Sequence, residues 1–253
     1  MNKKNRLVSA SGVFLAIAFA LLSTGRLSAG DDEAMVEKAI KALGGSVLRS
    51  REGNRIVWVT FGPSSNVTDS GLKELAGLKS LQKLYLGPRV TDAGLKELAG
   101  LKTLQSLSLN GTKVKGAGLK ELAGLTSLKQ LFLYDTQVTD AGLKELAGLK
   151  SLEYLDLDGT QVTDMGLKEL AVLKKLWELK LNRTKVTDAG LKDLAGLKSL
   201  GLLWLHGAKV TDAGLKELEG LKALVYLHIS GTKVTDAGVA ELQKALPKCK
   251  ITR

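Results

Sequence analysis

Two histidines, one cysteine and a pair of carboxylates are the side chains of this 253-residue chain best suited to acid–base or metal chemistry: His206, His228, Cys249, Asp156 and Asp158. A catalytic or metal centre needs three or more such groups converging on one point. The sequence contains no HExxH, GxSxG or CxxC motif and no glycine-rich phosphate loop. We therefore expect no catalytic residue, metal site or cofactor, and predict that the protein is not an enzyme.

A repeat of 24 residues sets the positions of these side chains. Its marker is the valine of VTDAG or a close variant, and after a first interval of 23 residues the next six intervals are all 24. These valines are Val67, Val90, Val114, Val138, Val162, Val186, Val210 and Val234. One strand and one helix cannot bury their own apolar sides, so neighbouring repeats must stack.

The unit at 152–175, LEYLDLDGTQVTDMGLKELAVLKK, shows the two halves of the repeat. Its first half alternates with period two, which predicts a short strand with one buried face. In its second half, leucines three apart predict a helical face. The expected fold is α/β: a solenoid with parallel strands on the concave face and short helices on the convex face.

The pattern LxxLxLxGTxVTDAGLKELAGL resembles a leucine-rich repeat over about residues 56–251. VTDAGLKEL is similar to the ITDxGLxxL repeats found beside F-boxes and in exported planctomycete proteins, although no F-box-like segment precedes the repeats here. The resemblance implies a right-handed horseshoe of about eight repeats. Thr160 and its equivalents stand where that family often has Asn or Cys, which predicts an internal ladder of threonines.

An aspartate such as Asp164 comes just before each predicted helix, where it is expected to cap the free N–H groups. In one copy Lys115 and Gly116 replace the usual Thr and Asp. We therefore expect the helix at 117–123 to lack its cap and to exchange its amide hydrogens faster than the neighbouring helices do.

The first 29 residues have the layout of a secretory signal: a basic start, an apolar run at 7–22 and the small residues SAG at 28–30. Cleavage is expected after Ala29. Because Leu27 is larger than cleavage sites prefer, an uncleaved anchor through residues 7–22 stays as an alternative. We predict export to the periplasm, the cell envelope or the medium. With one cysteine and no disulfide caps, a bacterial protein is the simpler interpretation.

The two ends of the repeat array are expected to be closed by their own elements. Residues 30–61 read as an N-terminal cap made of a helix at 31–45 and two strands at 46–61. At the other end, 246–251 reads as a final strand with Cys249 in a leucine position, which predicts a buried thiol.

The strand positions that do not carry the repeat's leucines form three columns on the concave face. The columns start at Trp58, Thr60 and Gly62 and are expected to end at Lys248, Lys250 and Thr252. They collect seven of the nine aromatic residues outside the signal, and both histidines. The predicted partner-binding residues are Tyr85, Phe132, Tyr134, Tyr154, Asp156, Trp204, His206, Tyr226 and His228.

These columns predict a binding module for a protein or peptide, because rigid aromatic side chains dominate binding hot spots. The alternatives are a structural or envelope-associated solenoid without a discrete ligand and, third, a carbohydrate-binding protein. Nucleic acid is not expected, since lysines in the columns are opposed by Asp156, Asp158 and Glu178. Removal of the signal would also lower the net charge from +11 to +7, with 33 basic and 26 acidic residues remaining.

Overall fold

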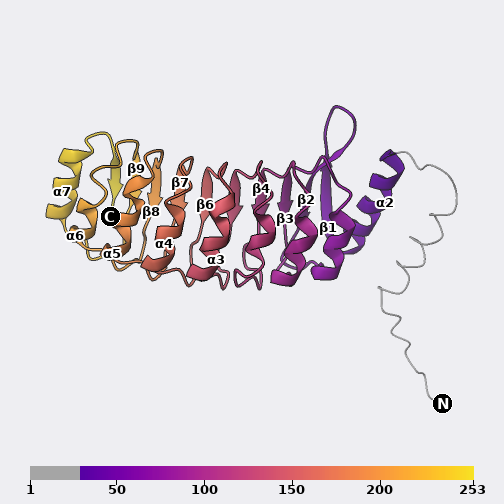
Figure 1. Ribbon diagram of the computed structural model, residues 1–253, viewed down its shortest axis with the longest axis horizontal. Helices are drawn as coiled ribbons and strands as arrows, with labels where there is room; N and C mark the ends of the chain where they lie inside the picture. Colours follow the sequence, from indigo (N-terminus) through magenta and orange to yellow (C-terminus); the bar gives the residue numbers. More distant parts are fainter. Residues whose placement is uncertain (1–28) are drawn as a thin grey trace, which may run out of the picture.

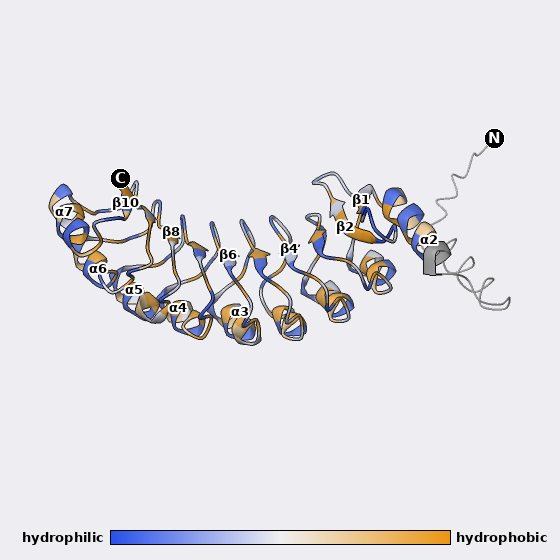
Figure 2. Cartoon of the chain, turned by 90° about the horizontal axis from the view of Figure 1, so that it is seen from above, coloured by the Kyte–Doolittle hydropathy of each residue, from blue (hydrophilic) through white to orange (hydrophobic). Residues whose placement is uncertain are grey.

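The computed structural model describes residues 29–253, which form one curved solenoid (Figures 1 and 2). In this part of the chain ten strands make a single sheet in the order β1 to β10. β1 is antiparallel to β2, and every later strand is parallel to its neighbour. Strands line the concave side and helices the convex side (Figure 2), which confirms the predicted α/β leucine-rich-repeat solenoid. The predicted signal lies outside the described residues except for Ala29.

Most strands are three residues long, as the short alternating segments of the repeat require. Their bounds are β1 Gly45–Arg49, β2 Ile56–Phe61, β3 Lys83–Tyr85, β4 Ser106–Ser108, β5 Gln130–Phe132, β6 Tyr154–Asp156, β7 Glu178–Lys180, β8 Leu202–Trp204, β9 Tyr226–His228 and β10 Lys250–Thr252.

The convex layer mixes 3₁₀ turns near the N-terminus with α-helices near the C-terminus. α2 spans Ala29–Ala42 and precedes the repeats. The others are η1 Asp69–Leu75, η2 Asp92–Leu98, η3 Leu119–Leu122, α3 Asp140–Lys144, η4 Glu145–Gly148, α4 Asp164–Leu170, α5 Asp188–Leu191, η5 Lys192–Gly196, α6 Asp212–Lys216 and α7 Asp236–Ala245.

The repeated leucines stack into one continuous core between these layers. In mid-solenoid Leu131, Leu155 and Leu179 are neighbours across three strands, and each is fully buried. The threonines behind the strands are buried as well, but the predicted ladder between repeats is wrong. Thr160, for example, donates its hydroxyl hydrogen to the carbonyl of Leu157 in its own coil, at 2.6 Å. The chain turns just after the strand, and this turn brings the carbonyl of Leu157 within hydrogen-bond distance of the Thr160 hydroxyl.

The repeat's aspartates connect successive coils, which differs from the predicted capping role. Asp164 is the first residue of α4, and its carboxylate accepts from the N–H and the hydroxyl of Thr187, one coil later, at 2.8 and 2.7 Å. Thr187 in turn accepts from the N–H of Ala189 and caps α5. The same two bonds recur at Asp69, Asp140, Asp188 and Asp212, so these aspartates also orient the threonine of the next coil.

The divergent copy at 115–116 keeps a cap from an unexpected source. Asp92, in the preceding coil, accepts from the N–H groups of Lys115, Gly116 and Gly118 at 2.7–3.0 Å. The N-terminus of η3 therefore has a hydrogen-bond acceptor. The expectation that this helix would lack its cap was wrong. The next Thr, Thr139, makes no side-chain cap, because Gly116 supplies no carboxylate to orient it.

At the C-terminal ends of the helices, lysines form hydrogen bonds to the next coil. Lys102, Lys174 and Lys198 donate to the carbonyls of Gly124, Gly196 and Gly220, one coil later, at 3.1–3.3 Å. A cation at a helix C-terminus is favoured by the helix dipole and satisfies a free carbonyl. The second lysine of GLKELAGLK is thus part of the connection between repeats.

Replacing Asp164 by alanine is expected to lower the free energy of unfolding by about 1.5–3 kcal/mol, because hydrogen bonds to a charged acceptor are lost and the N–H of Thr187 is left unpaired. Urea denaturation followed by circular dichroism measures this change. Lys168→Ala, an exposed substitution on the same helix, is the control and should change stability by less than about 0.5 kcal/mol.

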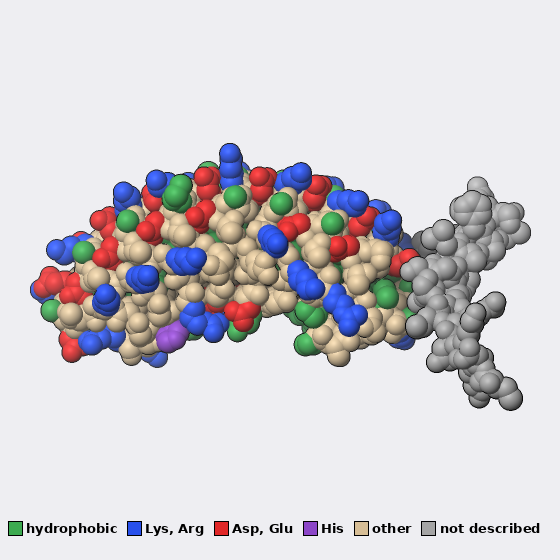
Figure 3. Space-filling model, turned by 90° about the horizontal axis from the view of Figure 1, so that it is seen from below, with side chains coloured by type: hydrophobic (Ala, Val, Ile, Leu, Met, Phe, Trp, Pro, Cys, Tyr) green, Lys and Arg blue, Asp and Glu red, His purple; other side chains and the backbone are tan. Residues whose placement is uncertain are grey.

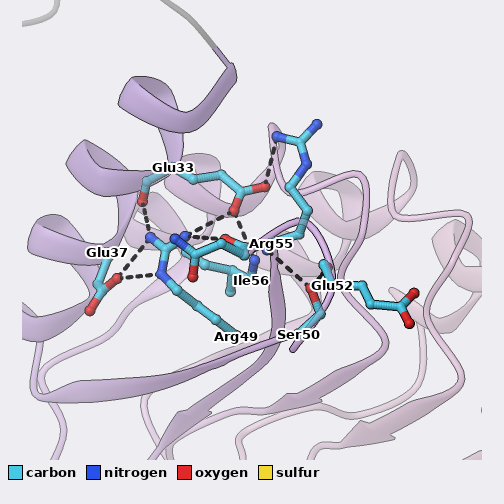
Figure 4. A network of polar contacts seen from close by, with 8 residues as sticks. Glu33, Glu37, Arg49, Ser50, Glu52, Arg55 and Ile56 are labelled. Carbon is cyan, nitrogen blue, oxygen red and sulfur yellow. Dashed lines mark hydrogen bonds and ion pairs between the residues drawn. The ribbon is translucent and has the colours of Figure 1, made fainter.

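A buried carboxylate holds α2 against the β1–β2 hairpin (Figure 4). Glu33 is 6% exposed and accepts from the N–H of Ile56 at 2.8 Å. Its oxygens also lie 3.4 Å from guanidinium nitrogens of Arg49 and Arg55. Arg49 pairs in addition with Glu37 at 2.8 Å. Salt bridges and the Ile56 hydrogen bond thus close the N-terminal end of the core.

At the C-terminal end the strand lies later than expected. β10 pairs Lys250 with Tyr226 and Thr252 with His228, two residues out of the predicted register, and it begins after Cys249. The observed strand keeps the 24-residue period, whereas the predicted strand at 246–251 has its leucine positions only 22 residues after those of β9. Cys249 is buried, as predicted, and burial raises the pKa of its thiol to about 11.

None of the helices within residues 29–253 combines the length and the apolarity needed to cross a membrane.

Candidate ligand-binding face

The strand register brings the predicted concave columns together from β2 to β9. Trp58 pairs with Lys83 and Thr60 with Tyr85, so the 23-residue interval does not shift the columns. The pairing continues without slip to Tyr226 and His228. The last strand keeps the same spacing, so Thr252, and not the predicted Lys250, lies beside His228.

An aromatic band occupies the C-terminal half of this face. We use this name for Phe132, Tyr154, Trp204, Tyr226, His228 and His206. Ring centroids lie 4.7 Å apart for Phe132 and Tyr154, 5.0 Å for Trp204 and Tyr226, and 5.9 Å for the two histidines. Most of these rings are half-buried, because they pack against one another. Mutual packing restricts their rotamers and makes the surface rigid.

Tyr85 lies apart from the aromatic band. It packs edge-on against Trp58 with the ring centroids 5.5 Å apart. Ser106 and Ser108 of β4 then separate this pair from Phe132 in the sheet. Two aromatic clusters therefore exist on the concave face, and the C-terminal one is the larger.

Lys180 joins the two parts of the aromatic band. Its ammonium lies 5.4 Å from the ring centroids of both Tyr154 and Trp204. Glu178, 3.9 Å from the Lys180 ammonium, accepts from the indole N–H of Trp204 at 3.1 Å. A cation between two aromatic faces is attracted by both quadrupoles, so Lys180 and Glu178 belong to the site although neither was among the predicted residues.

Asp156 is the buried carboxylate of the site, at 7% exposure. It accepts from the N–H of Asp158 at 3.0 Å and contacts the Tyr154 hydroxyl at 3.5 Å. Burial raises the pKa of Asp156, and the charge of Asp158 adds to this shift. Burial likewise raises the pKa of Glu178 above its ordinary value and that of Tyr154 to about 12.

Because the pKa of Asp156 is raised in the folded state, the folded protein binds this proton more readily than the unfolded chain does. The contribution of Asp156 to stability is therefore lost as the pH rises through the folded pKa, above 3.8. Asp156→Asn should be as stable as the wild type or more stable at pH 7. The variant should also gain less stability than the wild type when the pH is lowered, because it lacks the titrating carboxylate of Asp156. Urea midpoints between about pH 4 and 7 measure both effects; a less stable variant at pH 7 would contradict them.

A chain of hydroxyls and imidazoles ends the aromatic band. The Ser230 hydroxyl lies 2.8 Å from Nδ1 of His206 and 2.7 Å from Nε2 of His228. Nδ1 of His228 contacts the hydroxyl of Thr252 at 3.0 Å, and the Tyr226 hydroxyl is 3.1 Å from the same oxygen. Burial and the charge of His206 both lower the pKa of His228.

This arrangement places a serine next to a histidine but lacks the features of a hydrolase triad. The group behind His228 is the neutral hydroxyl of Thr252, which cannot stabilise an imidazolium as a carboxylate does. Within residues 29–253, His, Cys, Asp and Glu side chains do not gather in threes to hold a metal. The geometry suits hydrogen bonding to a ligand better than proton transfer.

Tyr134 is held from the turn side by a residue that the sequence interpretation missed. Arg183 lies over its ring at 5.6 Å and within 3.7 Å of Asp135. Asp135 and Arg183 both have positive φ, at 51° and 55°, where equivalent turns have glycine. A side chain built on Gly159, between them, would collide with the carboxylate of Asp135. Non-glycine residues are strained in this conformation. The contacts of the Asp135 and Arg183 side chains, and not the backbone of the turn, therefore account for these two residues.

Comparisons with known proteins agree with the repeat fold. The leucine-rich-repeat family model matches residues 102–162. A search of curated protein sequences found no match. An internalin C2 structure from Listeria monocytogenes is similar at 27% identity and a TM-score of 0.63, covering 86% of this chain and 92% of that one.

Two further structures resemble parts of the solenoid. The internalin inlF from Listeria monocytogenes is 25% identical with a TM-score of 0.55, over 76% of this chain and 59% of that chain. The present chain thus spans about three fifths of that internalin. A plant peptide hormone receptor, RGFR1 in complex with RGF2, shares the fold at 18% identity and a TM-score of 0.51, over 71% of this chain and 33% of that one. The repeat, the sheet and these similarities agree that the chain has the leucine-rich-repeat fold, with the family model matched at residues 102–162.

Proposed function

We propose that the protein is an exported, non-enzymatic binding module that takes a protein loop or peptide across the C-terminal half of its concave face. The observation that carries this proposal is the contiguity of the aromatic band, which continues from Phe132 to His206 over coils whose fold does not require aromatics. The proposal of export rests on the signal-like segment at 1–29.

Rigidity supports binding by this surface. The rings of the aromatic band pack on one another, and Lys180 lies between two of them. A ligand that contacts side chains already fixed in place loses less entropy than one that must order them. Aromatic residues also supply much contact area for few rotatable bonds.

The polar groups of the face suggest how a ligand would be oriented. His206 is exposed, and its Nδ1 is bonded to Ser230, which leaves Nε2 directed away from that bond. Tyr134 is 37% exposed. His206, within the aromatic band, and Tyr134, beside it, lie just after the ends of their strands and are suited to backbone amides and carbonyls of an extended segment. A plant peptide hormone receptor with this fold, RGFR1, has a structure in complex with RGF2.

The test is capture of partners in the native cells by crosslinking and mass spectrometry, comparing the wild type with a combined Phe132→Ala, Tyr134→Ala and Tyr154→Ala variant. We expect the specific partners to be lost while the circular dichroism spectrum is kept. Tyr85→Ala, outside the aromatic band, is the matched control and should retain them.

Two other results would overturn the proposal. Partners that persist unchanged in a folded triple variant would favour a structural solenoid without a ligand on this face. Binding of purified protein to a glycan array, lost in the same variant, would identify a carbohydrate ligand instead, since sugar rings also pack on aromatic faces.

A further inference from the structure

A second surface lies along the edge of the solenoid at which the parallel strands begin. Trp177 and Val225 immediately precede β7 and β9 and are 44% and 45% exposed. Gly201 occupies the equivalent place between them, and the indole of Trp177 lies over it: a Cβ at 201 would come within 2.5 Å of the ring. The absence of a side chain at 201 lets the indole lie flat across the next coil.

The coil that carries Trp177 departs from the repeat in this region. Val172 stands where most copies have glycine, and it is 40% exposed. Lys175 stands where the other copies have Ser, Thr or Ala, and Trp177 replaces Gln, Lys or Glu of the preceding copies. Since the repeat dictates none of these three residues, the fold does not explain them.

Lysines surround these apolar side chains. They occupy the position three residues before that of Trp177 in each coil except the one with Thr126, and are exposed at Lys79, Lys102, Lys150, Lys174, Lys198 and Lys222. At about 4.8 Å per strand the row is roughly 30 Å long. A second copy of this basic chain would be repelled by such a row, whereas an anionic surface would be attracted.

We propose that this edge docks on an anionic lipid surface, with Trp177 and Val225 entering the headgroup region and the lysines contacting lipid phosphates. Figure 2 looks onto this edge, and Figure 1 shows that the strands of the repeats begin at similar heights, while the loop between β1 and β2 projects beyond them. Isolated protruding side chains along the repeats suit a fluid interface, where tryptophan is favoured. They suit a partner protein less well, because neither residue lines the cavities beside α2 or between α6 and α7.

The opposite edge provides a matched control within the same molecule. Figure 3 shows Lys and Arg side chains spaced along it as well. Lys185 and Lys209 belong to this row and are exposed. Of the exposed large apolar side chains, Trp177, Val225 and Val172 belong to the first edge, whereas Tyr134 follows β5 and Met165 lies in the first turn of α4, toward the opposite edge. Electrostatic attraction alone would therefore bring either edge to an anionic surface, whereas the proposal expects only the first edge to dock there.

The experiment needs a readout local to the edge, because the apolar run at 7–22 of the full chain would itself bind lipid. We would use the full chain with Trp58→Phe and Trp204→Phe, so that Trp177 is the only fluorophore of its type. Quenching by brominated lipids is measured in phosphatidylcholine vesicles with and without about one third phosphatidylglycerol. Trp177 emission should be quenched in the anionic vesicles.

Charge variants separate the two edges. Lys150→Gln with Lys175→Gln, two lysines that make no side-chain hydrogen bond in the described structure, should weaken vesicle affinity roughly 10-fold or more. Lys185→Gln with Lys209→Gln should leave the quenching of Trp177 unchanged. In the variant that carries only Trp177→Phe, the remaining tryptophans are Trp58 and Trp204 on the concave face. Their emission should not be quenched.

Three results would overturn the proposal: no quenching of Trp177 in anionic vesicles, equal quenching in neutral ones, or equal loss with both lysine pairs. A shift of Trp177 emission on addition of polyglutamate, with none on vesicles, would assign the edge to an acidic protein instead. Because the concave face and this edge are separate surfaces, none of these results bears on partner capture by the aromatic band.

Discussion

Trp204→Ala is expected to abolish partner capture and to destabilise the solenoid. The indole contacts Tyr226, His228 and Lys180, and its N–H donates to Glu178. It therefore connects both halves of the aromatic band. Central, well-packed tryptophans are the most frequent binding hot spots, and truncating one costs about 2–4 kcal/mol, a loss of roughly 30-fold or more in affinity.

The stability loss should be smaller than for a core residue. Replacing a fully buried tryptophan by alanine costs about 3–5 kcal/mol. Trp204 is half-buried, so we expect about 2–3 kcal/mol. Urea denaturation measures the stability, and titration of the captured partner by calorimetry measures the affinity.

Trp58→Ala is the matched control for this prediction. Trp58 also packs on a tyrosine, Tyr85, and also has a lysine, Lys83, over its ring. Trp58→Ala should lower the free energy of unfolding by a similar amount but leave the affinity for the captured partner unchanged. Equal loss of affinity in both variants would show that the binding defect follows from instability and not from the position of Trp204.

Glu33→Ala is expected to open the N-terminal end of the solenoid and to lower the free energy of unfolding by about 2–4 kcal/mol. The buried N–H of Ile56 would lose its acceptor, which costs about 1–3 kcal/mol. Arg49 and Arg55 would lose a charged partner at the same time. The cost stays below that of a fully buried ion pair because the side chain of Arg55 is 42% exposed.

Hydrogen exchange should show where this energy is lost. We expect faster exchange in α2 and β1 of Glu33→Ala, with the coils beyond β4 unchanged, because each coil of a solenoid contacts only its neighbours. Glu37→Ala removes only partly exposed pairs and should cost less than about 1 kcal/mol. Glu33→Gln retains an acceptor for Ile56 and should lie between the two. Uniform acceleration along the chain would contradict this local role.

Much of the concave face could be predicted from the sequence because a 24-residue period converts position along the chain into position on a surface. The alternation around Leu155 and Leu157 places Tyr154 and Asp156 on the open side, and stacking repeats the same assignment in every coil. The register from Ser106 to Thr252 follows from that period alone. The prediction for the last strand failed because it placed Lys248 opposite Tyr226, 22 residues later, where the period places Lys250.

Contacts between coils could not be predicted in the same way. Asp164 was expected to cap its own helix because local sequence offers that acceptor, but only the stacking distance brings Thr187 within reach of it. The paired burial of Asp156 and Glu178 with Lys180 depends on the same distance. Which side chains pair across coils depends on rotamers and burial, and neither is encoded in the spacing of the residues.

The sequence by itself thus determined the solenoid, its leucine core and the membership of the concave columns, because a strict repeat leaves one way to bury its apolar sides. The tertiary structure decided that the rings form two clusters instead of one, that Arg183 and Asp135 hold Tyr134, and that Trp177 lies on an edge over Gly201. These facts depend on distances of a few ångströms between residues in different coils, which arise only when the coils are packed.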